Sequence, residues 1–240
     1  YWEKLAELSK RTAQAGVAVA LSKKAYLAKT DTDFGWNEEA WKYGTELELC
    51  GLSPAYTHDT TNAYFLHCES AKLMTDDELE FLMSRPVVTD AETVAILAAR
   101  GYDLGIETRR INALTLSTKY TDHPANRGFE GRSWRLPWAT NVAYSIVGKG
   151  EKAGFEPMLR YVNDSMESVP GDGEAAAVTL TTPFGGKWAV FGDGLWNRVM
   201  SGERRTELLN VLEYINPGRM TAVLETHAKA IVLPREDSEK

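Results

Sequence analysis

Hydrophobic positions recur with helical spacing in the first part of the chain, and short apolar runs between the helical segments give the alternation of an α/β fold. Residues 2–15 place apolar side chains on one stripe and charged side chains opposite, which predicts a helix that Gly16 ends. The apolar run 17–21 then predicts a short buried strand. A second helix fits residues 37–50, because Asn37 is a favourable N-cap and acidic residues follow it in the first turn. Further apolar runs predict strands at residues 54–57 and 63–67.

The clearest local signals lie between residues 75 and 101. Thr75 and Glu78 have the spacing of a capping box, which predicts a helix that stops before a proline. Residues 86–89 predict a strand, and Asp90 is placed to cap a further helix that Gly101 ends. Strands that alternate with helices at this spacing predict a parallel sheet with crossover helices.

The pattern changes between residues 106 and 183. β-Branched and aromatic residues there stand among Gly, Pro, Asn and Asp, and helical periodicity fades. Antiparallel strands are predicted at residues 111–116, 142–147, 155–161 and 176–180. We therefore expect residues 1–240 to form a single α/β domain with a β-rich insertion or subdomain at about residues 106–183.

The α/β pattern returns near the end of the chain. Residues 186–191 predict a strand, a Gly-Asp-Gly turn follows, and residues 201–215 predict an amphipathic helix. Residues 230–233 predict a closing strand with no partner following it. Since the chain also begins with Tyr rather than Met, we expect a fragment of a larger protein, either a processed form or an excised domain.

Composition and charge narrow the classes of function. Hydrophobic residues make up 43% and charged residues 25% of the 240 residues, the mix of an ordinary globular protein. The chain has 27 basic and 34 acidic residues and a formal net charge of −7, so we expect no nucleic-acid partner. No apolar run approaches the ~20 residues that cross a bilayer, so we expect no membrane partner. The first residues do not resemble a signal peptide, and the compartment is left open.

Residues that bind metals are sparse. The chain has four histidines, with no H-x-H or H-x-x-x-H spacing, whereas zinc sites usually take two ligands from one short segment. We therefore expect no metal and no cofactor. The two cysteines, Cys50 and Cys68, do not form a C-x-x-C pair. Two reduced thiols are predicted, with a single disulfide between them as the alternative.

Cys68 is the candidate for nucleophilic catalysis. It follows the predicted strand 63–67, at the place where α/β enzymes present catalytic groups. A nucleophile elbow needs small neighbours, and no glycine flanks Cys68. A small buried thiol is therefore the simpler interpretation.

Two other motifs are candidates for ligand binding. Trp134 and Trp138 lie in the loop-rich part, where their rings could stack on sugars, although tryptophan more often belongs to a core. Asp193 lies between two glycines after a strand, which fits a weak phosphate cradle or, more simply, a turn that needs positive φ. Arg204 and Arg205 are expected on a solvated face.

Residues 75–101 also carry a family resemblance. A helix leads there into a strand ending in Asp90, and the next helix begins Asp-Ala-Glu and ends Arg-Gly. This segment resembles the α/β domain that follows the catalytic barrel in bacterial proteins related to the glycoside hydrolase family 42 beta-galactosidases. Residues 120–124, 188–192 and 204–209 are similar to later parts of that domain, so the resemblance covers roughly residues 36–220.

The resemblance implies a fold and a biochemical context. That domain is similar to class I glutamine amidotransferases, which implies a flavodoxin-like three-layer sandwich, and in the beta-galactosidases it mediates trimerisation. It does not imply catalysis by this chain. The amidotransferase triad needs a glycine-flanked Cys and a His two residues before a Glu, and the one such pattern, His67 to Glu69, lies in the wrong place.

Three hypotheses follow from these observations. The leading one is a non-catalytic α/β domain of a glycoside-hydrolase-like protein that serves oligomerisation or active-site shaping, with the rest of the parent polypeptide and its catalytic barrel as partner. The first alternative is a cysteine-dependent hydrolase or amidotransferase that uses Cys68. The second is a carbohydrate-binding module that uses Trp134 and Trp138. A homo-oligomer and bound carbohydrate are the further partners that these hypotheses allow.

Overall fold

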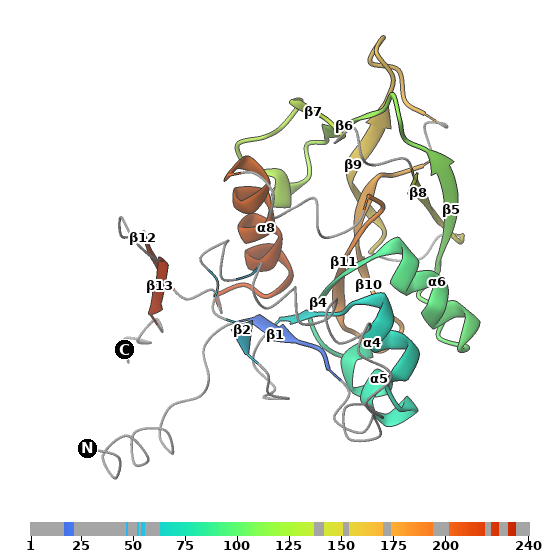
Figure 1. Cartoon of the computed structure of the whole chain (residues 1–240), viewed down its shortest axis with the longest axis vertical. Coiled ribbons are helices and arrows are strands. Elements are labelled where there is room, and N and C mark those ends of the chain that lie inside the picture. The colour runs from blue at the N-terminus through green and yellow to red at the C-terminus, as the bar shows by residue number, and fades with distance from the viewer. Residues whose placement is uncertain are drawn as a thin grey trace, which may run out of the picture.

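A computed structural model describes a mixed α/β fold built on a large β-sheet (Figure 1). It describes residues 17–21, 47, 52, 54–55, 63–136, 142–150, 154–169, 174–193, 202–218, 222–225 and 230–233. The helix expected at residues 2–15 and nearly all of the helix expected at 37–50 lie outside the described residues.

The first half of the sheet is parallel, as the alternation of helices and strands predicts. The strands β1 and β2 pair in parallel, as do β1 and β3, β3 and β4, and β4 and β11. Their bounds are β1 (Val17–Val19), β2 (Pro54–Ala55), β3 (Tyr64–Phe65), β4 (Val87–Asp90) and β11 (Lys187–Phe191). The nine-stranded sheet has the order β2-β1-β3-β4-β11-β10-β9-β6-β7.

The second half of the sheet is antiparallel. Its strands are β10 (Ala177–Thr181), β9 (Glu156–Val162), β6 (Ser117–Tyr120) and β7 (Ser133–Arg135). β10 pairs with β11 on one side and with β9 on the other, so the antiparallel strands continue the parallel sheet. The sequence predicts β9 and β10 but not β6 and β7, which are short and carry polar residues.

Two further ladders complete the strands. β5 (Ile106–Asn112) pairs with β8 (Val142–Gly148) in an antiparallel ladder. The strand predicted at 111–116 is wrong, because β5 ends at Asn112 and the backbone then turns, with the Leu116 N–H bonded to the Ala113 carbonyl. β5 alternates exposed charges with half-buried residues, which hides its strand character in the sequence.

The second ladder lies near the end of the chain. β13 (Ala230–Leu233) pairs with β12 (Ala222–Glu225), a strand before it that the pattern does not predict.

Helices cover both faces of the sheet. Figure 1 shows α8 (Gly202–Ile215) on one side and α4 (Cys68–Leu73), α5 (Asp76–Met83) and α6 (Ala91–Ala99) on the other. Alternate residues of a strand point to opposite faces. Val88 accordingly belongs to the apolar cluster that contains Leu208 of α8, while its neighbour Val87 belongs to the cluster that contains Leu79 and Leu97.

Helix caps explain where α5 and α6 begin. The Thr75 hydroxyl accepts a bond from the Glu78 N–H, and the Glu78 carboxylate accepts one from the Thr75 N–H, which confirms the predicted capping box. Asp90 caps α6, and Gly101 after that helix has a φ of 94°, as predicted. The sequence did not predict α4, whose N-cap is His67.

Candidate functional site at the carboxyl edge of the parallel strands

Three parallel strands bring candidate side chains to the same edge of the sheet. His67 and Cys68 follow β3, Asp90 ends β4, and Asp193 follows β11. Open α/β sheets bind ligands outside the carboxyl ends of their parallel strands. This edge is therefore a candidate site for ligand binding or catalysis.

Cys68 is the first residue of α4, and its thiol is free and buried. Its Sγ lies 3.9 Å from Nδ1 and 3.7 Å from Nε2 of His67. A thiol aimed at the lone pair of one nitrogen would lie clearly farther from the other, so these near-equal distances do not describe an aligned thiol–imidazole pair. The His67 Nδ1 instead accepts the Glu69 N–H at 3.2 Å and caps α4. The ring is held as a helix cap, with Nδ1 already engaged.

The surroundings of Cys68 disfavour its thiolate. Burial raises the pKa of the Cys68 thiol to about 12, with further raising by the negative charges of Asp90, Glu92 and Glu69. Lys72 opposes this shift weakly, and its ammonium is paired with Glu69. Because the thiolate is the nucleophilic form of cysteine, the raised pKa disfavours the nucleophilic form of Cys68 at neutral pH.

Asp90 acts as a helix cap at this edge. Its Oδ1 accepts bonds from the N–H and the hydroxyl of Thr93, both at 2.8 Å. Burial raises the pKa of the Asp90 carboxyl, while the two Thr93 hydrogen bonds and the nearby His67 lower it. The structure thus gathers Cys68, His67 and Asp90 at one edge, but two of the three groups cap helices.

Gly192 brings β8 against the end of β11. The Tyr144 N–H donates to the Gly192 carbonyl at 2.8 Å, and the Gly192 N–H donates to the Ala176 carbonyl at 2.8 Å. A Cβ at Gly192 would overlap the Tyr144 carbonyl oxygen and lie 2.7 Å from the Tyr161 hydroxyl. Gly192 does not have a positive φ, and the close approach of the backbones excludes any side chain there. Gly194, the other glycine of the predicted turn, lies outside the described residues.

The contact between β8 and the end of β11 places Tyr144 at the carboxyl edge of the parallel strands. Burial raises the pKa of its phenol, Glu92 and Asp90 raise it further, and Arg110 opposes them. The Tyr144 phenol and the Cys68 thiol therefore experience the same two carboxylates. Both groups are held in their protonated forms.

Asp193 and Arg204 form a buried ion pair. Their closest atoms, Oδ2 and Nη1, lie 3.5 Å apart, and the side chains are 0% and 1% exposed. Arg204 also donates from Nη2 to the Thr118 hydroxyl at 3.2 Å. The expectation that Arg204 is solvated is wrong, because it lies on the inner face of α8 at helical spacing from the buried Glu207 and Leu208. Extending the predicted apolar face of this helix by one turn would have indicated its position.

The structure describes only one of the two tryptophans that were proposed to stack on sugars. Trp134 lies on β7 and is half-buried, and its ring centre is 5.6 Å from Cζ of Arg204. One face of this ring therefore contacts a guanidinium. Trp138 lies outside the described residues, so sugar stacking stays a prediction.

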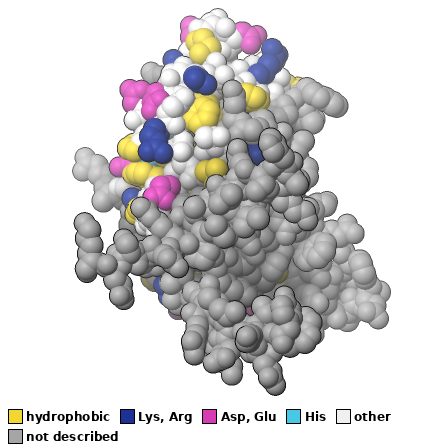
Figure 2. All heavy atoms as spheres, turned by 90° about the vertical axis from the view of Figure 1, so that its left-hand side faces the viewer, with side chains coloured by type: hydrophobic (Ala, Val, Ile, Leu, Met, Phe, Trp, Pro, Cys, Tyr) yellow, Lys and Arg dark blue, Asp and Glu magenta, His cyan; other side chains and the backbone are white. Residues whose placement is uncertain are grey.

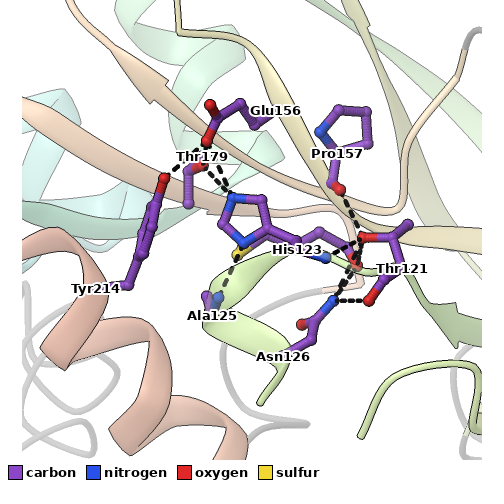
Figure 3. Close-up of polar contacts among 9 residues, drawn as sticks. Thr121, His123, Ala125, Asn126, Glu156, Pro157, Thr179 and Tyr214 are labelled. Atoms are coloured by element: carbon purple, nitrogen blue, oxygen red, sulfur yellow. Dashed lines mark hydrogen bonds and ion pairs between the residues drawn. The ribbon is translucent and has the colours of Figure 1, made fainter.

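A cluster that the sequence did not indicate lies between α8 and the antiparallel strands (Figure 3). His123 precedes the 3₁₀ helix η1 (Pro124–Asn126), and its Nε2 lies 3.2 Å from Oε2 of Glu156 and 3.0 Å from Oγ1 of Thr179. The Tyr214 hydroxyl donates to the same Glu156 oxygen at 2.7 Å. The available local signal was the His-Pro pair, because proline favours the first position of a helix and the residue before it is extended.

Other classes of site are absent from the parts of the chain that the structure describes. In those parts, no group of three or more His, Cys, Asp or Glu residues is arranged to hold a metal ion. No described helix is both long and apolar enough to span a membrane. On the face in Figure 2, the coloured side chains include basic, acidic and hydrophobic ones interspersed with each other.

Compared with known proteins, the sequence matches no family model and is significantly similar to no curated protein.

Proposed function

We propose that this chain is a non-catalytic α/β domain of a larger carbohydrate-processing protein, in which it serves oligomerisation or shapes the surroundings of an active site. The observation that carries this proposal is the state of Cys68. The thiol lies where an α/β enzyme would present its nucleophile, yet burial and three carboxylates hold it protonated. The residues at the carboxyl edge of the parallel strands stabilise the fold and do not take part in a reaction.

The strand order supports a flavodoxin-like fold for the parallel half. Its order β2-β1-β3-β4-β11 corresponds to 2-1-3-4-5 when the five parallel strands are numbered along the chain. This is the order of flavodoxin-like doubly wound sheets. Such a sheet with helices on both faces is what the resemblance to amidotransferase-like domains implies. The resemblance then supplies the carbohydrate context, and the catalytic barrel of the parent polypeptide is the proposed partner.

The chemistry of Cys68 supports a non-catalytic role. With a pKa of about 12, on the order of one Cys68 thiol in 10⁵ is ionised at pH 7. His67 does not compensate, because its Nδ1 accepts the Glu69 N–H and its ring is not aligned with the sulfur. A nucleophile of this kind lacks both the charge and the base that acyl transfer needs.

Alkylation of the purified chain with iodoacetamide, followed by mass spectrometry at Cys68, tests this proposal. The rate should rise without a plateau up to pH 10, because the thiolate fraction keeps increasing. A plateau below pH 8, together with glutaminase or glycosidase turnover that Cys68→Ala abolishes, would overturn it. Sedimentation of the chain measures the oligomeric part of the proposal, and a monomer at every concentration would leave only active-site shaping.

The meeting of Cys68, His67 and Asp90 at one edge favours one alternative, a cysteine-dependent hydrolase. In that case Asp90 would orient His67, and His67 would take the proton of Cys68. The two hypotheses differ in the thiol pKa, so the same alkylation profile separates them. The carbohydrate-binding alternative depends on Trp134 and Trp138, and a galactoside titration followed by tryptophan fluorescence tests it.

A further inference from the structure

His123 is buried where four elements meet. Its side chain is 5% exposed and lies among η1, β9, β10 and the last turns of α8. Nδ1 accepts the Ala125 N–H at 3.1 Å, so this nitrogen carries no proton. The neutral ring therefore holds its proton on Nε2, which points at Glu156 and Thr179. Both ring nitrogens of His123 therefore already take part in hydrogen bonds.

A second proton would have to go on Nδ1. It would then face the Ala125 N–H, which leaves two donors against each other and removes the cap of η1. The imidazolium would also be buried, and burial disfavours the charged form. Protonation of His123 is thus incompatible with this arrangement of η1.

Charged groups from the packed elements do not reverse this conclusion. Glu156 on β9 favours the imidazolium, but its side chain is 53% exposed and already accepts the Tyr214 hydroxyl. Lys187 on β11 opposes it, and the neutral ring of Tyr214 on α8 packs edge-to-face with His123, with 4.7 Å between the ring centroids. Thr179 on β10 is uncharged. Burial, as the largest effect, lowers the pKa of His123.

The ring holds two elements in place. η1 contacts α8, where the Asn210 side chain donates to the Arg127 carbonyl at 3.0 Å. η1 is also bonded to β9, where the Asn126 side chain donates to the Met158 carbonyl at 2.6 Å. Tyr214 lies in the last turn of α8 and packs on the His123 ring. The end of α8 and the η1 segment therefore depend on one imidazole.

We propose that His123 is a proton-sensitive clamp, which fixes η1 and the last turn of α8 to β9 and β10 when neutral and releases them when protonated. This inference goes beyond the proposed function and does not depend on it. Because the folded pKa of His123 is lowered, its contribution to stability is fully present above the unfolded value of ~6.5 and is lost as pH falls below that value.

Hydrogen exchange at the Ala125 amide between pH 7.5 and 5.5 tests the clamp, after correction for the intrinsic exchange rate. In the wild type the opening equilibrium should increase about tenfold across this range, because the open form gains a proton that the closed form excludes. His123→Asn is the matched control. Its side-chain oxygen is a good N-cap acceptor but does not titrate, so its opening equilibrium should stay flat.

An equal increase in the wild type and in His123→Asn would overturn the proposal, since another group would then be responsible. A second measurement keeps the test independent of how the variant folds. An NMR titration of the wild-type His123 ring should give a pKa below ~6.5 and an Nε2–H tautomer at neutral pH. A pKa at or above that value, or an Nδ1–H tautomer, would also contradict the clamp.

Discussion

The guanidinium of Arg204 on α8 meets the carboxylate of Asp193, which follows β11, with 3.5 Å between Nη1 and Oδ2. Both side chains are buried, and Arg204 also bonds to Thr118 of β6 and lies over the ring of Trp134 of β7. A single arginine thus links α8 to the parallel and the antiparallel parts of the sheet. Since both charges are desolvated, the two residues depend on each other.

Breaking this ion pair from one side should be costly. Arg204→Met leaves the Asp193 carboxylate buried without the guanidinium, and we expect a loss of about 3–5 kcal/mol in the free energy of unfolding. The double variant Arg204→Met/Asp193→Leu should recover most of that loss, because neither charge of the pair is then left buried without the other. Urea unfolding measures both, with the half-exposed Arg205→Ala as control. A double variant no more stable than Arg204→Met would contradict this account.

Asp90 combines a structural role with an electrostatic one, and two substitutions separate them. Asp90→Asn keeps a capping oxygen but removes the charge, so the pKa of Cys68 should fall with little change in stability. Asp90→Ala also removes the cap and should cost about 0.5–2 kcal/mol. The pH dependence of Cys68 alkylation gives the pKa of the thiol, and urea unfolding gives the free energy of unfolding. An unchanged thiol profile in Asp90→Asn would show that this carboxylate does not reach Cys68.

Gly192 should tolerate no side chain. The Cβ of Gly192→Ala would overlap the Tyr144 carbonyl, and separating β8 from β11 should cost about 1–3 kcal/mol or more. Gly150→Ala is a suitable control, because Gly150 has a φ of 75° but open space around it and should cost only about 1–2 kcal/mol. If the two variants unfold at the same urea concentration, the close approach of the Gly192 and Tyr144 backbones does not contribute to stability.

The Glu156 carboxylate should contribute to acid stability. Hydrogen bonds from Tyr214 and His123 lower its pKa, so its contribution is present above the ordinary value near 4.5 and is lost as pH falls below it. Tyr214→Phe removes the largest of these causes and should raise the pKa of Glu156. Unfolding experiments between pH 6 and 3 should then show a smaller loss in the variant. A carbon-detected NMR titration of Glu156 checks the pKa directly.

The elements that the sequence predicts well are those with local causes. The caps of α5 and α6 rest on residues three positions apart, so Thr75 and Asp90 indicate them without knowledge of the fold. The parallel strands follow from apolar runs between helices. α4 was missed because six residues show no helical periodicity and its cap is a histidine.

The candidate sites were harder to predict because their causes are not local. Cys68 could be assigned to the end of a strand, but the carboxylates of Asp90 and Glu92 that suppress its ionisation come from another element. His123 meets Glu156 and Thr179 across 33 and 56 positions of sequence. Which of these residues come together depends on the register of β9 and β10, which no pattern in the chain specifies.

The two halves of the sheet share one strand. β11 pairs in parallel with β4 through residues 188–191 and antiparallel with β10 through residues 187–191. Deleting the segment that contains β5 to β10 would therefore expose the backbone of β11 as a new, apolar edge strand. Such an edge pairs readily with another chain, and the shortened protein should aggregate. The antiparallel strands that the chain supplies in the middle of its sequence thus cover what would otherwise be an open edge of the parallel half.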